Sequence, residues 1–278
     1  MATTNQYGSG FSLPELMVPT QAATIFAAQE NSLYLPGILI PTVNVPAGSD
    51  SVKIAKLDAV AAQSITTEVD PGVDLNVLKP GAAAVNLDLE LIAARTTLRD
   101  IGGVNAADMG RVMGNAIAAK VDTMVSVAMA SLTVDEFDLA TILDQFYRSV
   151  GMIREAGDNG ALTCVVSAAA YHEFMGAVAG SAFAGSETQN NAMKSGFIGT
   201  IAGVPCYTSS YLNDTNTGLT ATKFAVFSQD AMRLATQGGV KLEAERRAAA
   251  VGQDIVASTA FQVGVIDATR GVIVQNAV

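Results

Sequence analysis

The chain has 278 residues and a mass of 28.6 kDa, which is near the upper limit for one hydrophobic core. Half of the residues are hydrophobic and only 15% are charged, which indicates that part of the surface is covered by copies of the chain or by a partner. The net charge of -10 argues against a phosphate-binding surface and against sequence-specific binding of nucleic acid. No apolar stretch has the length and composition of a membrane span, and residues 1–14 lack the features of a signal peptide.

Prolines interrupt the first 47 residues at five places. Each proline fixes φ and removes an amide donor, so this stretch is predicted to be largely an extended arm, with one helical piece over residues 21–30. The arm is rich in apolar side chains over residues 33–40, which predicts that it lies on another surface. The prolines are Pro14, Pro19, Pro36, Pro41 and Pro46.

Two strand patterns follow, over residues 51–58 and 83–92, where apolar and polar residues alternate. Between them lie two strong turn signals, Asp70-Pro71-Gly72 and Lys79-Pro80-Gly81. The pattern predicts a long hairpin, and the segment from Asp50 to Glu90 has seven acidic residues against three basic ones. We expect such a hairpin to be ordered by a neighbouring subunit, as an assembly device.

A long helix is predicted over residues 106–132. Asn105 is a good N-cap, no proline interrupts the segment, and apolar side chains recur every three or four residues. This stripe is predicted to face the core as the spine of an extended body. It consists of Met109, Met113, Ile117, Val121, Met124, Ala128 and Leu132.

A capping-box pattern from Thr133 to Glu136 predicts a second helix that Gly157 closes. The rest of the chain alternates between the two kinds of element, so the fold class is α+β. The predicted elements are strands at 162–166, 204–208 and 223–227, helices at 167–175 and 228–237, and a β-rich return from residue 240.

The sequence contains no recognisable catalytic or metal-binding motif. His172 is the only histidine, which excludes most zinc sites and catalytic triads, and it is expected to be a partly exposed helical residue. Phosphate-binding glycine loops and nucleophile elbows are absent from the sequence. Cys164 and Cys206 have no CxxC spacing, and a reducing cytoplasmic compartment would leave them as buried thiols without a bridge. No catalytic, cofactor-binding or metal-ligating residue is predicted.

Four charged residues of the predicted hairpin are candidates for a functional role. Glu68 and Asp70 could do acid and base chemistry, but a solvated surface is the simpler interpretation because nothing places them in a pocket. Lys53 and Lys56 could be reactive amines, although lysines at a hairpin edge more often prevent unwanted strand pairing.

Several short segments carry a resemblance when they are taken in order along the chain. They are Val52-Lys-Ile-Ala, the strand from Leu87 to Leu98 that leads into the long helix with Asp108 and Asp122, Gly199-Thr-Ile-Ala-Gly-Val-Pro-Cys-Tyr-Thr-Ser, Phe224-Ala-Val-Phe-Ser-Gln-Asp-Ala, Glu243-Ala-Glu-Arg-Arg and Gly264-Val. With the order of arm, hairpin, long helix, mixed module and β-rich return, they resemble the major capsid proteins of tailed phages, whose shell fold is shared with encapsulins. The resemblance covers most of the chain.

The resemblance implies a tailed-phage capsid fold and its domain organisation. Residues 1–47 would be the N-terminal arm, 48–84 the extended loop and 85–134 the peripheral domain with the spine helix. Residues 135–239 would be the axial domain, and 240–278 the β-rich return to the peripheral domain.

The resemblance also implies a structural subunit rather than an enzyme. Such a subunit self-assembles as hexamers and pentamers into an icosahedral head that encloses double-stranded DNA, without a cofactor or a membrane. It would be made in the host cytoplasm and reside in the virion, with possible separate scaffold, portal and decoration proteins. Lys53, Lys56, Glu68 and Asp70 would be candidate inter-subunit contacts. Some relatives form covalent Lys–Asn links, but no partner Asn can be assigned in this sequence.

Two other functions remain open at this point. The first is an encapsulin-like compartment that stores a cargo enzyme, and the second is a soluble enzyme of unrecognised type. A shell subunit with a free arm and hairpin should expose clearly more than the roughly 11,000 Å² of a compact monomer of this mass.

Overall fold

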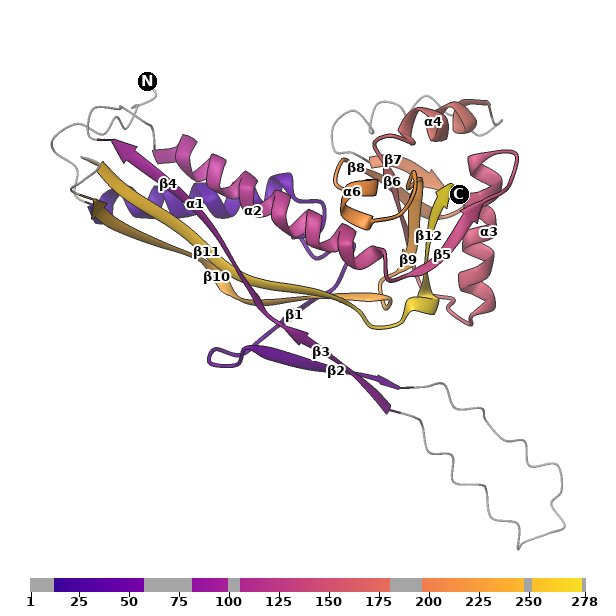
Figure 1. The fold of residues 1–278 in the computed structure, drawn as a ribbon, viewed down its shortest axis with the longest axis horizontal. Coiled ribbons are helices and arrows are strands. Elements are labelled where there is room, and N and C mark those ends of the chain that lie inside the picture. Colours follow the sequence, from indigo (N-terminus) through magenta and orange to yellow (C-terminus); the bar gives the residue numbers. More distant parts are fainter. Residues whose placement is uncertain (1–12, 58–81, 100–105, 181–196, 248–251, 277–278) are drawn as a thin grey trace, which may run out of the picture.

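The computed structural model describes residues 13–57, 82–99, 106–180, 197–247 and 252–276. These residues form an elongated body from which a two-stranded hairpin projects (Figure 1). The accessible surface of the chain is 15497 Å², whereas a compact monomer of this mass exposes about 11,000 Å². The elongated shape of the described residues agrees with the expected extended subunit (Figure 1).

The helices and strands follow one another in a mixed α+β order. They are α1 (Leu13–Asn31), β1 (Thr42–Asn44), β2 (Ser51–Leu57), β3 (Ala82–Asp88), β4 (Glu90–Arg99), α2 (Ala106–Met129), β5 (Thr133–Phe137), α3 (Ile142–Glu155), β6 (Leu162–Ser167), α4 (Tyr171–Gly180), β7 (Phe197–Ile201), β8 (Val204–Ser209), α6 (Asp214–Thr217), β9 (Phe224–Ser228), β10 (Met232–Arg247), β11 (Gly252–Val265), the short 3-10 helix η2 (Ala268–Arg270) and β12 (Gly271–Asn276).

One half of the body is a long four-stranded sheet in the order β1-β10-β11-β4. The strands β10 and β11 are antiparallel, and their register shifts between Gln237 and Lys241, where Gly238 has a φ of 68°. The helices α1 and α2 run along this sheet (Figure 1), and α2 contacts β11 and β4. The apolar stripe of α2 is thereby buried between the sheet and α1.

The other half is a six-stranded sheet in the order β5-β12-β9-β6-β8-β7. Every residue of β6 and β9 is buried, because both faces of this sheet are covered. On one face Phe146 of α3, Phe174 of α4 and Phe224 of β9 pack with ring centroids 6.2 to 6.3 Å apart. On the other face Val165 and Phe227 join the core that contains α2. The strands therefore appear as continuous apolar runs in the sequence.

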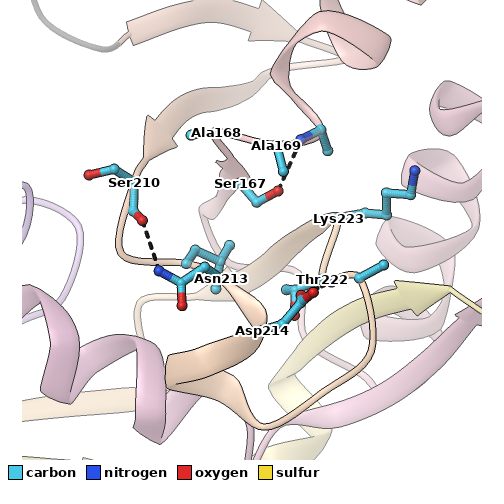
Figure 2. Close-up of a pocket in the computed structure, with 11 residues that line it drawn as sticks. Ser167, Ala168, Ala169, Ser210, Asn213, Asp214, Thr222 and Lys223 are labelled. Atoms are coloured by element: carbon cyan, nitrogen blue, oxygen red, sulfur yellow. Dashed lines mark hydrogen bonds between the residues drawn. The ribbon is translucent and has the colours of Figure 1, made fainter.

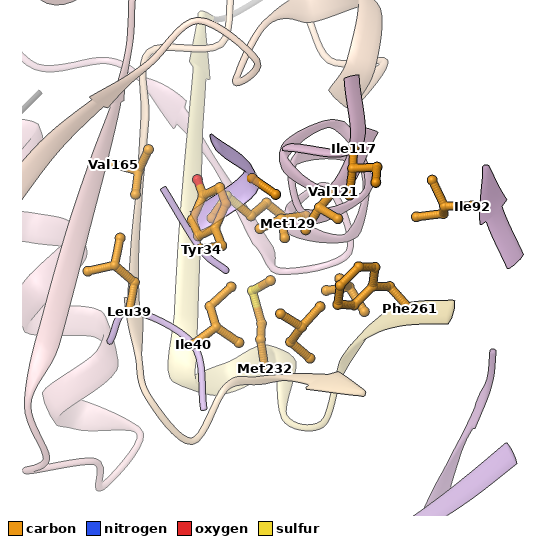
Figure 3. Packing of buried hydrophobic residues seen from close by; sticks show 14 of the residues in the cluster. Tyr34, Leu39, Ile40, Ile92, Ile117, Val121, Met129, Val165, Met232 and Phe261 are labelled. Atoms are coloured by element: carbon orange, nitrogen blue, oxygen red, sulfur yellow. The ribbon is translucent and has the colours of Figure 1, made fainter. Parts of the chain in front are cut away.

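The spine helix is confirmed as α2, which ends at Met129, three residues earlier than predicted. Its last turn tightens, since the amide of Leu132 donates to the carbonyl of Met129 at 3.0 Å. Within the stripe, Ile117 and Val121 are 1% and 0% exposed. Figure 3 shows them packed with residues from the first segment of the chain and from the long sheet. The assignment of this stripe to the core is confirmed.

The prediction of a largely extended arm is wrong for the described part of the first 47 residues. Residues 13–31 form one helix, α1, which packs along α2. Pro14 lies in the first turn, where a missing amide costs no hydrogen bond, and the helix continues through Pro19 because packing on α2 supports it. The apolar segment after the helix lies in the chain's own core, with Tyr34 and Ile40 fully buried (Figure 3).

The helix predicted from Thr133 is also wrong in its first part. Residues 133–137 form β5, which pairs in parallel with β12, and helix α3 begins only at Ile142. Its N-cap is Thr141, whose side chain accepts a hydrogen bond from the amide of Asp144 at 3.2 Å. Pairing with a strand about 140 residues away therefore overrides a local capping signal. Gly157, with a φ of 89°, follows the helix end as predicted.

The helix predicted over residues 228–237 does not form. Residues 229–231 make a turn, in which the amide of Ala231 donates to the carbonyl of Ser228 at 3.0 Å, and β10 begins at Met232. This strand pairs with β1 on one side and β11 on the other, so two long-range partners decide its conformation. The other predicted strands and the helix at 167–175 are present, with shifted ends; that helix is α4.

Candidate assembly surfaces and the hairpin base

The described residues contain cavities but no arrangement of side chains that resembles a catalytic centre. A cavity of 190 Å³ lies between the end of β6 and the loop before β9 (Figure 2). Its polar groups are used by the fold: Ser167 accepts from the amide of Ala170, Asn213 donates to the carbonyl of Ser210, and Asp214 accepts from the amide of Thr222. Among the described residues no group of three or more His, Cys, Asp or Glu side chains could hold a metal ion.

The remaining candidates for chemistry have structural positions. His172 lies exposed on α4, as expected for a helical surface histidine. Cys164 and Cys206 are buried, unbridged and opposite each other in the parallel pair β6 and β8. Burial raises the pKa of the Cys164 thiol, which makes this group a poor nucleophile.

The hairpin is present as the antiparallel pair of β2 and β3, with Val52 opposite Leu87 and Ile54 opposite Val85. Its apolar face is half buried against the chain itself: Leu87 is 3% exposed and belongs to a small cluster with Val45 and Ala235. The base of the hairpin is therefore part of the subunit's own core. The hairpin tip, residues 58–81, lies outside the described residues.

The four charged residues named from the sequence have different positions. Lys53 is exposed and has no ion pair within the described part of the chain. Lys56 lies on the other face of β2 and pairs with Asp267 of the same chain, with Nζ 3.0 Å from Oδ1. Glu68 and Asp70 lie outside the described residues.

Asp267 belongs to a charged network that the sequence did not reveal. Two short connections carry the chain directly between the two sheets, at 229–231 and at 266–270, and we call these two crossings the waist. The amides of Ile266 and Asp267 donate to the carbonyl of Ala231 at 2.8 and 3.2 Å, so the crossings lie side by side. Arg270 bridges them through Asp230, at 3.4 Å.

The network at the waist has balanced charges. It contains three acidic and three basic side chains, and it joins the hairpin, both crossings and the loop before β6. Its members are Lys56, Asp158, Asp230, Arg233, Asp267 and Arg270. The only signal in the sequence is Asp267 two residues before Thr269, which is typical of a capped turn.

A buried carboxylate joins the N-terminal segment to the spine helix. Asp122 of α2 is 3% exposed; it accepts a hydrogen bond from the Ser32 hydroxyl at 2.5 Å and one from the amide of Leu33 at 3.3 Å. Burial raises the pKa of Asp122 to about 6, although these two hydrogen bonds act to lower it. A cavity of 200 Å³ reaches this carboxylate.

The exposed side chains include several large apolar ones, distributed over both halves of the body. Exposed apolar side chains on an elongated chain are available for contact with other subunits. They are Phe26, Ile38, Leu91, Val112, Val127, Val134 and Tyr147. None of the helices in the described parts of the chain is long and apolar enough to cross a membrane.

Comparison with solved structures assigns this arrangement of hairpin, spine helix, long sheet and six-stranded sheet to the capsid fold of tailed phages. The fold expected from the resemblance is therefore confirmed. No protein-family model matches the sequence. No curated protein matches it either.

The individual likenesses are structural, with little sequence identity. The chain is similar to the capsid structure of the cyanophage P-SCSP1u, with a TM-score of 0.63, 13% identity, and coverage of 85% of this chain and 86% of that one. For the mature capsid of bacteriophage PhiM1 the TM-score is 0.61, with 14% identity and coverage of 90% and 86%. For a virus-like particle from Pyrococcus furiosus it is 0.63, with 7% identity and coverage of 92% and 97%.

Proposed function

We propose that the chain is a major capsid protein that self-assembles as hexamers and pentamers into an icosahedral phage head enclosing double-stranded DNA. The observation that carries the proposal is an elongated body with the capsid fold, from which the hairpin projects (Figure 1). Large apolar side chains are exposed on both halves of this body, and specific interfaces bury about 800 Å² per partner. A subunit of this shape has surface for several neighbours.

The role is structural rather than enzymatic in this proposal. The domains follow the organisation of the fold, with an arm at 1–47, an extended loop at 48–84, a peripheral domain at 85–134, an axial domain at 135–239 and a return at 240–278. The subunit is made in the host cytoplasm and becomes part of the virion. Scaffold, portal and decoration proteins are its expected partners.

The distal part of the hairpin is the proposed contact with adjacent subunits. Lys53, Glu68 and Asp70 are its candidate ion-pair residues, each pair being worth about 0 to 1 kcal/mol if exposed. Lys56 differs, because it already has a partner in its own chain. In a closed shell the small free energies of many equivalent contacts would add up to a substantial stabilisation.

An encapsulin-like compartment that stores a cargo enzyme is the second candidate. The observation in favour of this second function is the likeness to a virus-like particle from Pyrococcus furiosus, a particle whose fold is similar to that of this chain. The contents of purified particles separate the two functions. Nuclease-protected DNA supports a phage head, whereas a co-purifying enzyme supports a compartment.

The test of shell formation is electron microscopy of the purified chain, where closed particles of uniform size are expected. A variant with residues 60–80 replaced by a short Gly-Ser turn should fold but not close shells. The matched control replaces the same residues by a Gly-Ser segment of equal length. Comparing the two variants distinguishes the loss of specific side-chain contacts from the loss of hairpin length. Closed particles at normal yield from the short variant would refute the role of the hairpin, and a purely monomeric wild-type chain would refute the shell.

A further inference from the structure

The hairpin is attached to the body at three separate points. Leu87 of β3 packs against Gly264 of β11, so close that a Cβ at position 264 would overlap the leucine side chain. Gln237 of β10 donates its side-chain amide to the carbonyls of Pro46 and Ser49, at 2.9 and 2.6 Å, and so holds the turn that enters β2. The third point is the Lys56–Asp267 ion pair, on the other strand of the hairpin and farther toward its tip than Leu87.

Hydrogen bonds from its own segment hold the Asp267 carboxylate in place, in addition to its ion pair with Lys56. Its Oδ1 accepts hydrogen bonds from the amide and the hydroxyl of Thr269, at 3.2 and 2.7 Å, and the side chain is 11% exposed. Burial acts to raise the pKa of Asp267, but the hydrogen bonds from Thr269 and Lys56 outweigh it and lower the pKa. A carboxylate held in this way offers Lys56 an acceptor at one fixed place.

The same carboxylate is connected to the waist. Nε of Arg270 lies 3.4 Å from Oδ2 of Asp267, and the guanidinium also reaches Asp230 on the other crossing at 3.4 Å and Asp158 at 3.7 Å. Asp158 is 7% exposed, and its Oδ2 accepts no hydrogen bond within the described part of the chain, so Arg270 supplies its charge partner. Through Asp267 and Arg270, the hairpin is therefore connected to the segment that also joins the two sheets.

We propose that Lys56 and Asp267 are positioning residues that set the direction in which the hairpin leaves the body and couple it, through Arg270, to the waist between the two sheets. Leu87, Gln237 and the apolar cluster around Val45 hold the hairpin at its base, where β3 also leads into β4. The ion pair holds the hairpin farther toward its tip, so it fixes the direction in which the two strands leave this base. Because the hairpin is the proposed contact with neighbouring subunits, the importance of this device for assembly rests on the proposed function.

The test is a distance measurement between spin labels on the unassembled chain. Labels at Ala84→Cys on β3 and Val127→Cys on α2 both sit at exposed positions, and the native thiols are buried. Wild type should give one narrow distance distribution. Lys56→Met should lose that narrow peak, and Lys56→Arg should retain it, because Met keeps the unbranched stem without the charged amino group and Arg keeps the charge.

Lys53→Met is the matched control, because Lys53 lies three residues away on the opposite face of the same strand and has no ion pair among the described residues. It should leave the distribution unchanged. Circular dichroism and a thermal unfolding curve should show that Lys56→Met folds, since the substitution is at a half-exposed strand position. An unchanged narrow peak in Lys56→Met, or equal broadening in Lys53→Met, overturns the proposal.

The assembly readout is kept separate from the distance measurement. If wild type forms shells, Lys56→Met should give particles of mixed size or open sheets, and Lys56→Arg should give closed particles. Uniform closed particles from Lys56→Met together with a lost narrow peak would overturn the link to assembly. If wild type forms no shells at all, the proposed function fails, and the distance measurement still decides whether Lys56 and Asp267 position the hairpin.

Discussion

Leu87 of the hairpin occupies the space that any side chain at Gly264 of β11 would need. The strand β3 therefore approaches β11 more closely than side chains on both partners would allow. This contact explains why the base of the hairpin belongs to the subunit's own core, although its alternating pattern predicted a device that depends on neighbours.

Gly264→Val should destabilise the chain by about 1 to 3 kcal/mol, because the new side chain forces Leu87 out of its place. The measurement is urea unfolding of the unassembled chain. The double variant Gly264→Val with Leu87→Ala should recover part of this loss, since the smaller residue vacates the space. If the two substitutions are additive, Leu87 and Gly264 do not share this contact.

Gly114→Ala should weaken the docking of α1 on α2, although alanine favours an isolated helix by about 1 kcal/mol. A Cβ at position 114 would lie 2.5 Å from the carbonyl oxygen of Thr24 and 2.7 Å from Cβ of Ala27, so the helices must move apart. We expect a net loss of about 1 to 3 kcal/mol and faster hydrogen exchange in α1.

Gly151→Ala in α3 is the control for this substitution, because no atom lies within 4 Å of the added Cβ. It should stabilise the chain by about 0.5 to 1 kcal/mol. The same stabilisation in Gly114→Ala would show that α1 does not pack closely on α2.

Asp122 should make the chain less stable as pH rises through about 6. Its pKa is raised by burial from the ordinary value of 3.8 to about 6, so the folded chain binds this proton more tightly than the unfolded chain does. The resulting stabilisation is complete below pH 3.8 and is lost as pH rises through about 6. A pKa difference of about 2 corresponds to about 3 kcal/mol.

Asp122→Asn removes this titration, and its amide oxygen can still accept the hydrogen bond from Ser32. We expect the stability of the variant relative to wild type to increase between pH 4 and pH 7, in urea unfolding at constant salt. Parallel curves for the two proteins over this range would contradict the raised pKa.

The two thiols should be inert in the folded chain. Cys164 and Cys206 are fully buried, and burial raises the pKa of Cys164, so little thiolate is available. A short pulse of iodoacetamide followed by mass spectrometry should find both unmodified without urea and both modified in urea. His172→Cys places a thiol at an exposed position and should react rapidly in the folded chain, which controls for the reagent. Rapid modification of Cys164 would mean that the core around β6 opens.

The elements that the sequence predicts well are those in which one local period decides the outcome. The helix α2 follows from a 3.6-residue apolar stripe that contains Ile117 and Val121, and both are buried. The hairpin follows from two alternating segments, and its register places Val52 opposite Leu87. The short buried strand around Val165 follows from a continuous apolar run, which is typical of a strand covered on both faces.

Local signals fail where pairing partners lie far apart in the chain. Thr133 begins a good capping box, but residues 133–137 pair with β12. Within the helix predicted over 228–237, the residues from Met232 on belong to β10, between β1 and β11. Residues 13–31 of the predicted arm form the helix α1, for which α2 offers Gly110 and Gly114 as a close packing surface. In each case the free energy of long-range burial and hydrogen bonding exceeds the small local preference.

The charged residues of the hairpin were likewise predictable from the sequence only in part. The sequence by itself determines that the hairpin carries Lys53 and Lys56 on opposite faces, because alternate residues of a strand point to opposite sides. Only the tertiary structure decides that Lys56 meets Asp267, more than 200 residues away, while Lys53 remains exposed. Strand periodicity is a local property of the backbone, whereas the partner of a charged side chain depends on which distant segment the packing of the two sheets brings beside it.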